Sequence, residues 1–237
     1  MDHFELRNGE MHAEDVSLAT LAAEVGTPVY VYSTATIARH ARVFVDAVQP
    51  LGDVLVAFAV KANPNAAVLA TLARLGLGAD VVSGGELARA LAAGVPASKI
   101  VFSGVGKTAE EMVQALDAGI GQFNVESEPE AELLSQIARQ RGTTAKIAFR
   151  INPDVDAGTH AKISTGKSEN KFGIAYDSAA TAYAMARDLP GLNAVGVAVH
   201  IGSQLTDLNP LEAAFGRIGD LIDEVRATWQ FYRDRRP

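Results

Sequence analysis

Phe58-Ala59-Val60-Lys61-Ala62-Asn63-Pro64 closes a short apolar run with a lysine and then a chain-breaking proline. An apolar run of this length is typical of a buried parallel strand. In α/β barrels the carboxyl ends of the strands carry the chemistry, so Lys61 is expected at the functional face. A lysine among apolar neighbours can lose its proton near neutral pH and condense with an aldehyde as a Schiff base. A solvated surface charge is the simpler alternative for a lysine at a strand end.

Short runs rich in Val, Ile and Phe alternate with stretches of helical length along most of the chain, which predicts an α/β fold with a parallel sheet. An eight-unit barrel typically needs about 250 residues or more, so the six units predicted here indicate a truncated barrel. The expected strands are Val54–Lys61, Gly78–Ser83, Lys99–Ser103, Gln122–Glu126, Lys146–Asn152 and Ala194–Gly202. The expected helices are Ser33–Val48, Ala66–Leu75, Gly85–Ala93, Ala109–Ala118, Glu128–Arg141, Ser178–Asp188 and Pro210–Ala227.

Two terminal segments depart from this repeat, so three parts are predicted. Residues 1–27 contain a short strand and turn, in Phe4-Glu5-Leu6 and Asn8-Gly9-Glu10, which we expect to pair with a sheet that this chain does not encode. Residues 28–227 form the partial barrel. Residues 228–237 form an atypical tail, which contains the single tryptophan and has no strand pattern.

The composition limits the classes of function. The 237 residues, 48% of them apolar, can bury the core of one sizeable domain. A net charge of −7 gives no electrostatic reason to expect nucleic acid or an anionic membrane as partner. The first residues lack the basic head of a signal peptide, and the absence of cysteine excludes a thiolate metal site and a cysteine nucleophile. We therefore expect a cytoplasmic protein.

The second expected strand leads into Asp80-Val81-Val82-Ser83-Gly84-Gly85-Glu86-Leu87. A buried carboxylate such as Asp80 is costly unless it is paired. Ser83 followed by Glu86 matches a helix cap with its reciprocal acid, so capping alone can explain both residues. The alternative is that Asp80 and Glu86 belong to a site at the strand end.

Ser103-Gly104-Val105-Gly106-Lys107-Thr108 follows a strand and matches part of a phosphate-binding loop. The full motif needs a glycine five positions before Gly106, where this chain has Val101. We therefore predict an ordinary strand-to-helix turn and no nucleotide hydrolysis.

Two further candidates lie at the ends of the fifth and sixth expected strands. Arg150 stands in an apolar run and needs either a carboxylate in a structural ion pair or an anionic ligand. His200 opens the string His200-Ile201-Gly202-Ser203-Gln204, and because no second histidine lies at metal-ligand spacing, no metal site is predicted. The polar loop Pro153–Gly173 between them is long, and loops of this kind are usually functional or disordered.

Five motifs in this order resemble one enzyme family. They are Ala59–Asn63, Asp80–Leu87, the strand with Arg150, the loop with Asp156-Ala157-Gly158-Thr159-His160 and Asn170-Lys171-Phe172-Gly173, and His200–Gln204. Together they resemble the decarboxylases of the alanine-racemase-like fold (fold type III), which use pyridoxal 5'-phosphate, and most closely the diaminopimelate decarboxylases. The resemblance runs from about Phe4 to about Val225.

The resemblance implies a fold and a set of site residues. The fold is a TIM-type (β/α)8 barrel, here truncated after about six βα units and without the family's C-terminal β-domain. Lys61 would be the catalytic residue that forms the Schiff base with the cofactor, Arg150 would face the phenolic oxygen, and His200 would stack on the ring. The residues implied to bind the cofactor are Lys61, Asp80, Glu86, Arg150, His200, Gly202 and Ser203.

The reaction implied is the conversion of meso-2,6-diaminopimelate to L-lysine, the last step of lysine biosynthesis, by a homodimer that acts on a small amino acid. The family's glycine-rich phosphate loop, the acid that pairs the pyridine nitrogen and the β-domain would follow Val225 and are not found. We therefore expect little activity from this chain alone. A decarboxylase for ornithine or arginine and a non-catalytic remnant remain as alternatives.

Overall fold

The computed structural model describes residues 2–155, 172–203 and 205–233. It divides into two compact units, Met1–Asp80 with Ala88–Ile100, and Val81–Leu87 with Val101–Pro237. Within the described residues, no helix is both long and apolar enough to cross a membrane.

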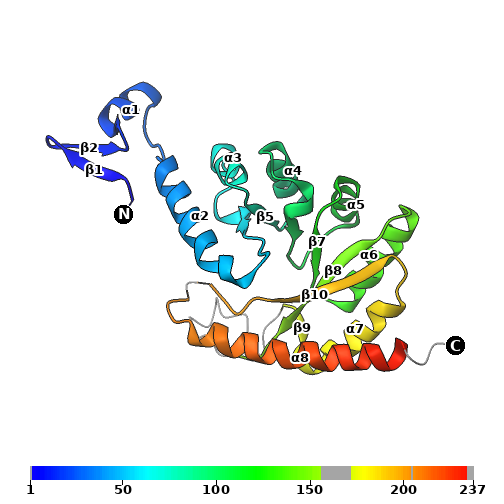
Figure 1. Ribbon diagram of the computed structural model, residues 1–237. Helices are drawn as coiled ribbons and strands as arrows, with labels where there is room; N and C mark the ends of the chain where they lie inside the picture. Colours follow the sequence, from blue (N-terminus) through cyan, green and yellow to red (C-terminus); the bar gives the residue numbers. More distant parts are fainter. Residues whose placement is uncertain (1, 156–171, 204, 234–237) are drawn as a thin grey trace. The chain divides into compact units, whose positions relative to one another are not determined.

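The N-terminal segment of the first unit is a small antiparallel sheet, shown in blue in Figure 1. Strand β1 (Phe4–Arg7) pairs with β2 (Glu10–Ala13), and β2 pairs with β3 (Val16–Ser17). Asn8 and Gly9 have φ values of 53° and 84°, as the tight turn of a two-residue hairpin requires. The strand and turn expected here are confirmed. Helix α1 (Leu18–Val25) follows, and its first turn is capped by the hydroxyl of Ser17.

The rest of the first unit packs helices on two parallel strands. Strand β4 (Ala57–Ala59) pairs in parallel with β5 (Gly78–Val81). The apolar core consists of Ala41, Val68, Leu72 and Leu77, with Ile37, Val56, Phe58 and Leu75 packed against it. The other elements are α2 (Thr34–Val48), η1 (Gln49–Leu51), η2 (Val60–Ala62), α3 (Ala66–Arg74), α4 (Gly84–Ala92) and η3 (Ala97–Lys99).

The second unit continues the alternation of strands and helices. Its strands are the end of β6 (Ile100–Phe102), β7 (Gln122–Val125), β8 (Ala145–Asn152), β9 (Ile174–Ala175) and β10 (Leu192–Val199). Its helices are α5 (Ala109–Ala118), α6 (Glu128–Gln140), η4 (Tyr176–Ser178), α7 (Ala179–Asp188) and α8 (Asn209–Arg233). The side chains of Phe102, Phe123, Ile147 and Phe149 are buried in its core.

The strands follow one another in the sheet in the order of the chain, β4, β5, β6, β7, β8 and β10, with β9 beside β8. This order has no reversal, so it is the winding of a barrel and not of a doubly wound sheet. All of the recorded strand pairs in this sheet are parallel. The predicted α/β fold with six parallel βα units is therefore confirmed.

Three elements differ most from the sequence-based expectation. Strand β4 has only three residues, because Val54–Val56 precede it outside the strand and Val60-Lys61-Ala62 form the 3-10 turn η2. The last strand ends at Val199 and not at Gly202. Helix α8 continues to Arg233, past the expected end at Ala227, so the beginning of the atypical tail is helical.

Tyr183 joins β8 to β10 where their register shifts between Ala194 and Gly196. Its hydroxyl donates a hydrogen bond to the Gly196 carbonyl oxygen over 2.6 Å and accepts one from the Phe149 amide over 3.3 Å. Burial raises the pKa of this phenol, so the hydroxyl stays neutral and can serve as both donor and acceptor. The side chain thus supplies hydrogen bonds that the irregular ladder lacks.

Candidate functional site

Lys61 lies directly beyond the carboxyl end of β4, as predicted. It is the second residue of η2, and Ala59, two residues earlier, is the register partner of Asp80 on β5. Val60 is fully buried, whereas Lys61 is exposed and Asp80 is half-buried. The short turn therefore brings Lys61 and Asp80 onto neighbouring strand ends and leaves the lysine accessible. The exposure of Lys61 agrees with the simpler alternative of a solvated charge at a strand end.

Glu86 and Ser83 cap the start of α4. The hydroxyl of Ser83 accepts a hydrogen bond from the Glu86 amide over 3.3 Å, and the Glu86 carboxylate accepts one from the Val82 amide over 2.8 Å. This is close to the capping-box arrangement, in which serine and acid satisfy amides at the helix start. Capping therefore accounts for the geometry of both residues.

Arg150 forms an ion pair with Glu126, which follows β7. Its Nη1 lies 3.0 and 3.1 Å from the two carboxylate oxygens, and the side chains of Arg150 and Glu126 are 14% and 3% exposed. Among the described residues, the buried Nε of Arg150 has no hydrogen-bond partner. The ion pair expected as the simpler alternative for Arg150 is present, and it leaves a donor of the guanidinium unused.

Lys107 lies in the turn between β6 and α5, where an ordinary strand-to-helix turn is predicted. Its Nζ donates to the Gly104 carbonyl, the Asn124 carbonyl and a Glu130 carboxylate oxygen at 2.6, 2.7 and 2.7 Å. An ammonium group has three N–H donors, so none remains for a phosphate. The side chain is fully buried, and burial raises the pKa of Glu130 while the attraction of Lys107 opposes that shift.

His200 follows β10, next to the strand that carries Arg150. Ala198, two residues earlier, is the register partner of Arg150. Nδ1 of the half-buried His200 accepts a hydrogen bond from the Gly202 amide over 3.2 Å, and Ser203 is exposed. The second unit thus brings Arg150, His200 and Gly202–Ser203 together near the carboxyl ends of β8 and β10. The motif residues in 156–171 lie outside the described residues.

The sequence analysis did not single out Glu126 or Glu130. Both are tied to cations far away in the chain, with separations of 24 residues for Glu126 and Arg150 and 23 for Lys107 and Glu130. The available signal was an acid directly after the strand Gln122–Val125. An acid at that position on a parallel sheet lies at the same end as Arg150.

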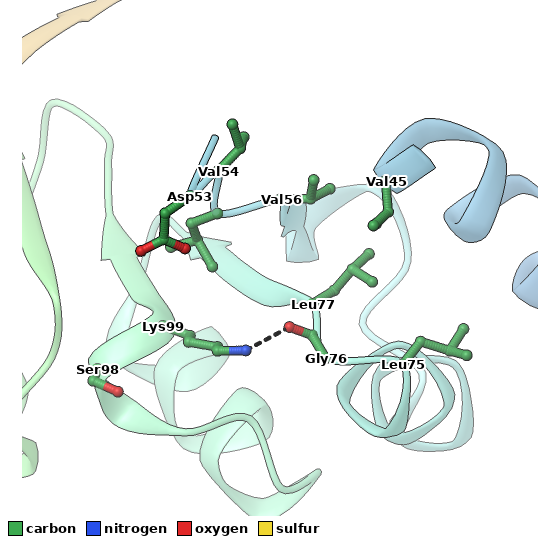
Figure 2. A pocket seen from close by; sticks show the side chains of 10 residues that line it. Val45, Asp53, Val54, Val56, Leu75, Gly76, Leu77, Ser98 and Lys99 are labelled. Atoms are coloured by element: carbon green, nitrogen blue, oxygen red, sulfur yellow. Dashed lines mark hydrogen bonds between the residues drawn. The ribbon is translucent and has the colours of Figure 1, made fainter. Parts of the chain in front are cut away.

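A cavity of about 320 Å³ lies in the first unit at the opposite, amino ends of the strands. Its wall includes Val54 and Val56 ahead of β4, Leu77 ahead of β5 and Lys99 ahead of β6. The ammonium group of Lys99 donates to the Gly76 carbonyl over 2.8 Å (Figure 2). None of the predicted site residues lines this cavity, and it lies at the end of the strands where parallel α/β folds do not place their chemistry.

A parallel sheet wound in chain order, with polar side chains at the carboxyl ends of its strands, defines a barrel-type α/β fold. A family model described as "Pyridoxal-dependent decarboxylase, pyridoxal binding domain" matches residues 34–230. The chain therefore belongs to the pyridoxal-dependent decarboxylase family and contains its pyridoxal-binding domain.

Curated relatives and solved structures agree with this assignment. The chain is 55% identical over 221 residues to the diaminopimelate decarboxylase of Zymomonas mobilis, covering 92% of this chain and 52% of the relative. It is 54% identical over 230 residues to that of Vibrio cholerae, covering 96% and 54%. The crystal structure of diaminopimelate decarboxylase from M. jannaschii in complex with L-lysine has a TM-score of 0.89 and 41% identity, covering 96% of this chain and 54% of that chain. The chain thus spans about half the length of these proteins.

Proposed function

We propose that this chain is the cofactor-binding part of a decarboxylase that converts meso-2,6-diaminopimelate to L-lysine. The observation that carries this proposal is the similarity to diaminopimelate decarboxylases over almost the whole chain. The L-lysine bound in the M. jannaschii relative supports the same product class. The wider proposal is a cytoplasmic homodimer that acts on a small amino acid in lysine biosynthesis.

In this proposal Lys61 would hold pyridoxal phosphate covalently through Nζ, which its exposed position beyond β4 permits. Arg150 would face the phenolic oxygen, and the unused Nε donor of its guanidinium fits an anionic acceptor. The bound cofactor would supply an electron sink for the charge left when carbon dioxide departs.

The remaining residues would orient the cofactor. His200, whose imidazole is held by the Gly202 amide, would present a flat face to the ring, and the exposed hydroxyl of Ser203 would donate to the phosphate. Asp80 and Glu86 would lie near the ring and Lys61; Asp80 is supported in this role by its register position beside Ala59.

Cofactor attachment can be tested with two lysine variants of the first unit. On addition of pyridoxal phosphate, the chain should gain visible absorbance, and borohydride reduction should then fix the cofactor on the peptide that contains Lys61. Lys61→Ala should abolish both signals. Lys99→Ala is the matched control, because Lys99 lines the cavity at the opposite strand ends. Labelling that survives Lys61→Ala and is lost in Lys99→Ala would move the cofactor to the cavity and refute the proposal.

The substrate can be tested in a chain completed by the remaining half of a relative, since this chain spans only about half of those proteins. We expect lysine from diaminopimelate and no amines from ornithine or arginine. Amine formation would favour the decarboxylase of another basic amino acid. No product from any of them, in a chain that binds the cofactor, would favour a non-catalytic remnant.

The chain alone should be poorly soluble and should turn over substrate negligibly. Among the described residues, β4 and β10 are the two edge strands of the sheet, and unpaired strand edges promote association. Size-exclusion chromatography and a thermal melt provide the measurement. A monomeric, cooperative transition would contradict this expectation.

A further inference from the structure

Glu126 and Arg150 form one end of a row of buried charges in the second unit. Lys107 pairs with Glu130 through Oε1, and the other oxygen of Glu130 accepts the Glu126 backbone amide over 3.0 Å. The side chain of Glu126 then pairs with Arg150. The order along the row is cation, anion, anion, cation, so the charges cancel, as groups with so little access to water require.

Glu126 is itself held at two points besides its ion pair with Arg150. Its amide is bound by Glu130, and one of its carboxylate oxygens also accepts the Gly104 amide over 3.2 Å. Gly104 has φ +96°, and a Cβ there would lie 3.3 Å from the Cβ of Val82, so this amide approaches in a conformation that favours glycine. The carboxylate that faces Arg150 is thus held by the Gly104 amide, and the backbone of Glu126 by the Glu130 side chain, so its position does not depend on its own rotamer alone.

Arg150 is also confined on another side. Its Cζ lies 5.8 Å from the centre of the Phe172 ring, and a Cβ at Gly173 would lie 2.8 Å from the Arg150 carbonyl oxygen and 3.2 Å from its Cγ. The guanidinium is therefore close to both the Glu126 carboxylate and the Phe172 ring, and the turn at Gly173 packs on the backbone and Cγ of Arg150. Its Nε, buried and without a partner among the described residues, is left for another acceptor.

We infer that Glu126 is a positioning residue, which aims the guanidinium of Arg150 at an anionic oxygen of the cofactor. This inference rests on the proposed function, in which Arg150 faces that oxygen. Glu126 itself need not touch the cofactor. It fixes the orientation of Arg150 and compensates one positive charge beside the cofactor.

The test uses the chain completed by the remaining half of a relative, as in the substrate test, and compares it with Glu126→Gln, which keeps the shape of the side chain and removes its charge. Asp117→Asn is the control, because Asp117 forms an ion pair with Arg141 on the exposed surface of the same unit. A thermal melt shows that each variant folds, and Glu126→Asp serves if Glu126→Gln does not. The Arg150 Nε–H resonance, assigned from its loss in Arg150→Lys, reports the guanidinium without any cofactor.

We expect a resolved Arg150 resonance in the unmodified chain and in Asp117→Asn, and a broadened or shifted one in Glu126→Gln. Pyridoxal phosphate should bind Glu126→Gln about tenfold more weakly. The pH at which the visible band is half-maximal should fall, since an uncompensated guanidinium disfavours a second positive charge nearby. In an Arg150→Lys background, Glu126→Gln should have a much smaller effect on binding, because it acts through Arg150.

Failure of the inference can be told apart from failure of the proposed function. The inference is overturned if Glu126→Gln changes neither the intensity nor the pH dependence of the Lys61-dependent absorbance. The proposed function is then unaffected. The inference is also overturned if Glu126→Gln weakens cofactor binding equally in the unmodified chain and in Arg150→Lys, since additive effects indicate that Glu126 has a structural role only. If the unmodified chain gives no Lys61-dependent absorbance, the proposed function is refuted. In that case, an Arg150 resonance that Glu126→Gln leaves unchanged also refutes the positioning role of Glu126.

Discussion

Strands β4 and β8 present their basic residues in opposite ways. The residues of β4 are half-buried, Val54 and Leu55 before it are 42% and 44% exposed, and Lys61 beyond it is exposed. In β8, Ile147, Phe149 and Ile151 are fully buried, and Arg150 among them is paired with a buried carboxylate. A residue that must be reached by a reactant needs access, whereas a residue that must point in one direction needs a rigid environment. The difference predicts that removing a polar contact lowers the free energy of unfolding far more around β8 than around β4.

Lys107→Met should produce the largest effect. It would leave Glu130, with its side chain 9% exposed, as a buried acid without its cation, which typically costs about 3–5 kcal/mol. The free energy of unfolding from urea titration measures this loss. Arg141→Met is the control. The side chains of Arg141 and its partner Asp117 are 43% and 48% exposed, and ion pairs this exposed contribute about 0–1 kcal/mol to stability. Equal losses in the two variants would contradict the contrast.

Gly173→Ala should come next, because it forces a side chain against Arg150. Gly173 has φ +80°, and its Cβ would lie 2.8 Å from the Arg150 carbonyl oxygen. Gly119→Ala is the matched control, with φ +71° and nothing within 4 Å of the added Cβ. Both variants should lose about 1–2 kcal/mol from the left-handed backbone, and Gly173→Ala about 1–3 kcal/mol more from crowding. If Gly173→Ala and Gly119→Ala have the same urea midpoint, the turn at Gly173 accommodates the added methyl group without disturbing β8.

The sequence predicts most of the architecture, because the patterns that define it are local. The hydroxyls of Ser33 and Thr108 cap α2 and α5, and Gly119 ends α5 in the left-handed conformation. Apolar runs and these helix signals therefore place six strands and seven helices close to their positions in the structure. Strand β9, with two residues, is too short to leave a periodic pattern.

The sequence predicts the site residues only in part. Lys61 and Arg150 stand out as basic residues at the ends of apolar runs. Their surroundings could not be predicted, since the contact of Arg150 with Glu126 joins residues 24 positions apart through neighbouring parallel strands. Periodicity indicates that a residue lies on a strand but not which side chain on the next strand it meets. The exposure of Lys61 likewise depends on the 3-10 turn η2, which replaces the last residues of the expected strand.

Tyr183→Phe tests whether β8 is also held by polar contacts at its other edge. The substitution would leave the Phe149 amide and the Gly196 carbonyl without the phenol between them, which should cost about 1–3 kcal/mol. Tyr176→Phe, whose hydroxyl donates to the Arg217 carbonyl outside the sheet over 3.0 Å, should cost less. Hydrogen exchange of the Phe149 amide gives a local measurement, and unchanged protection there would show that the ladder closes without Tyr183.

The smallest effect is expected in the first unit, at the half-buried Glu14, whose carboxylate joins the N-terminal segment to α2. Glu14 accepts hydrogen bonds from the Ser33 hydroxyl and the Ala35 amide, both at 2.8 Å, and the bond to the Ala35 amide is the main cause that lowers its pKa. Because the folded pKa lies below the unfolded one, this stabilisation is present above the unfolded pKa and is lost as the pH falls through the folded pKa. Residues of β1 and β2 should therefore exchange amide hydrogens faster relative to α3 as the pH falls from about 6 to about 3. Glu14→Gln should remove this pH dependence, because an amide side chain does not titrate. If the exchange of β1 and β2 keeps the same pH dependence in Glu14→Gln, other groups cause it. The contrast with the buried charges around β8 would then be weaker.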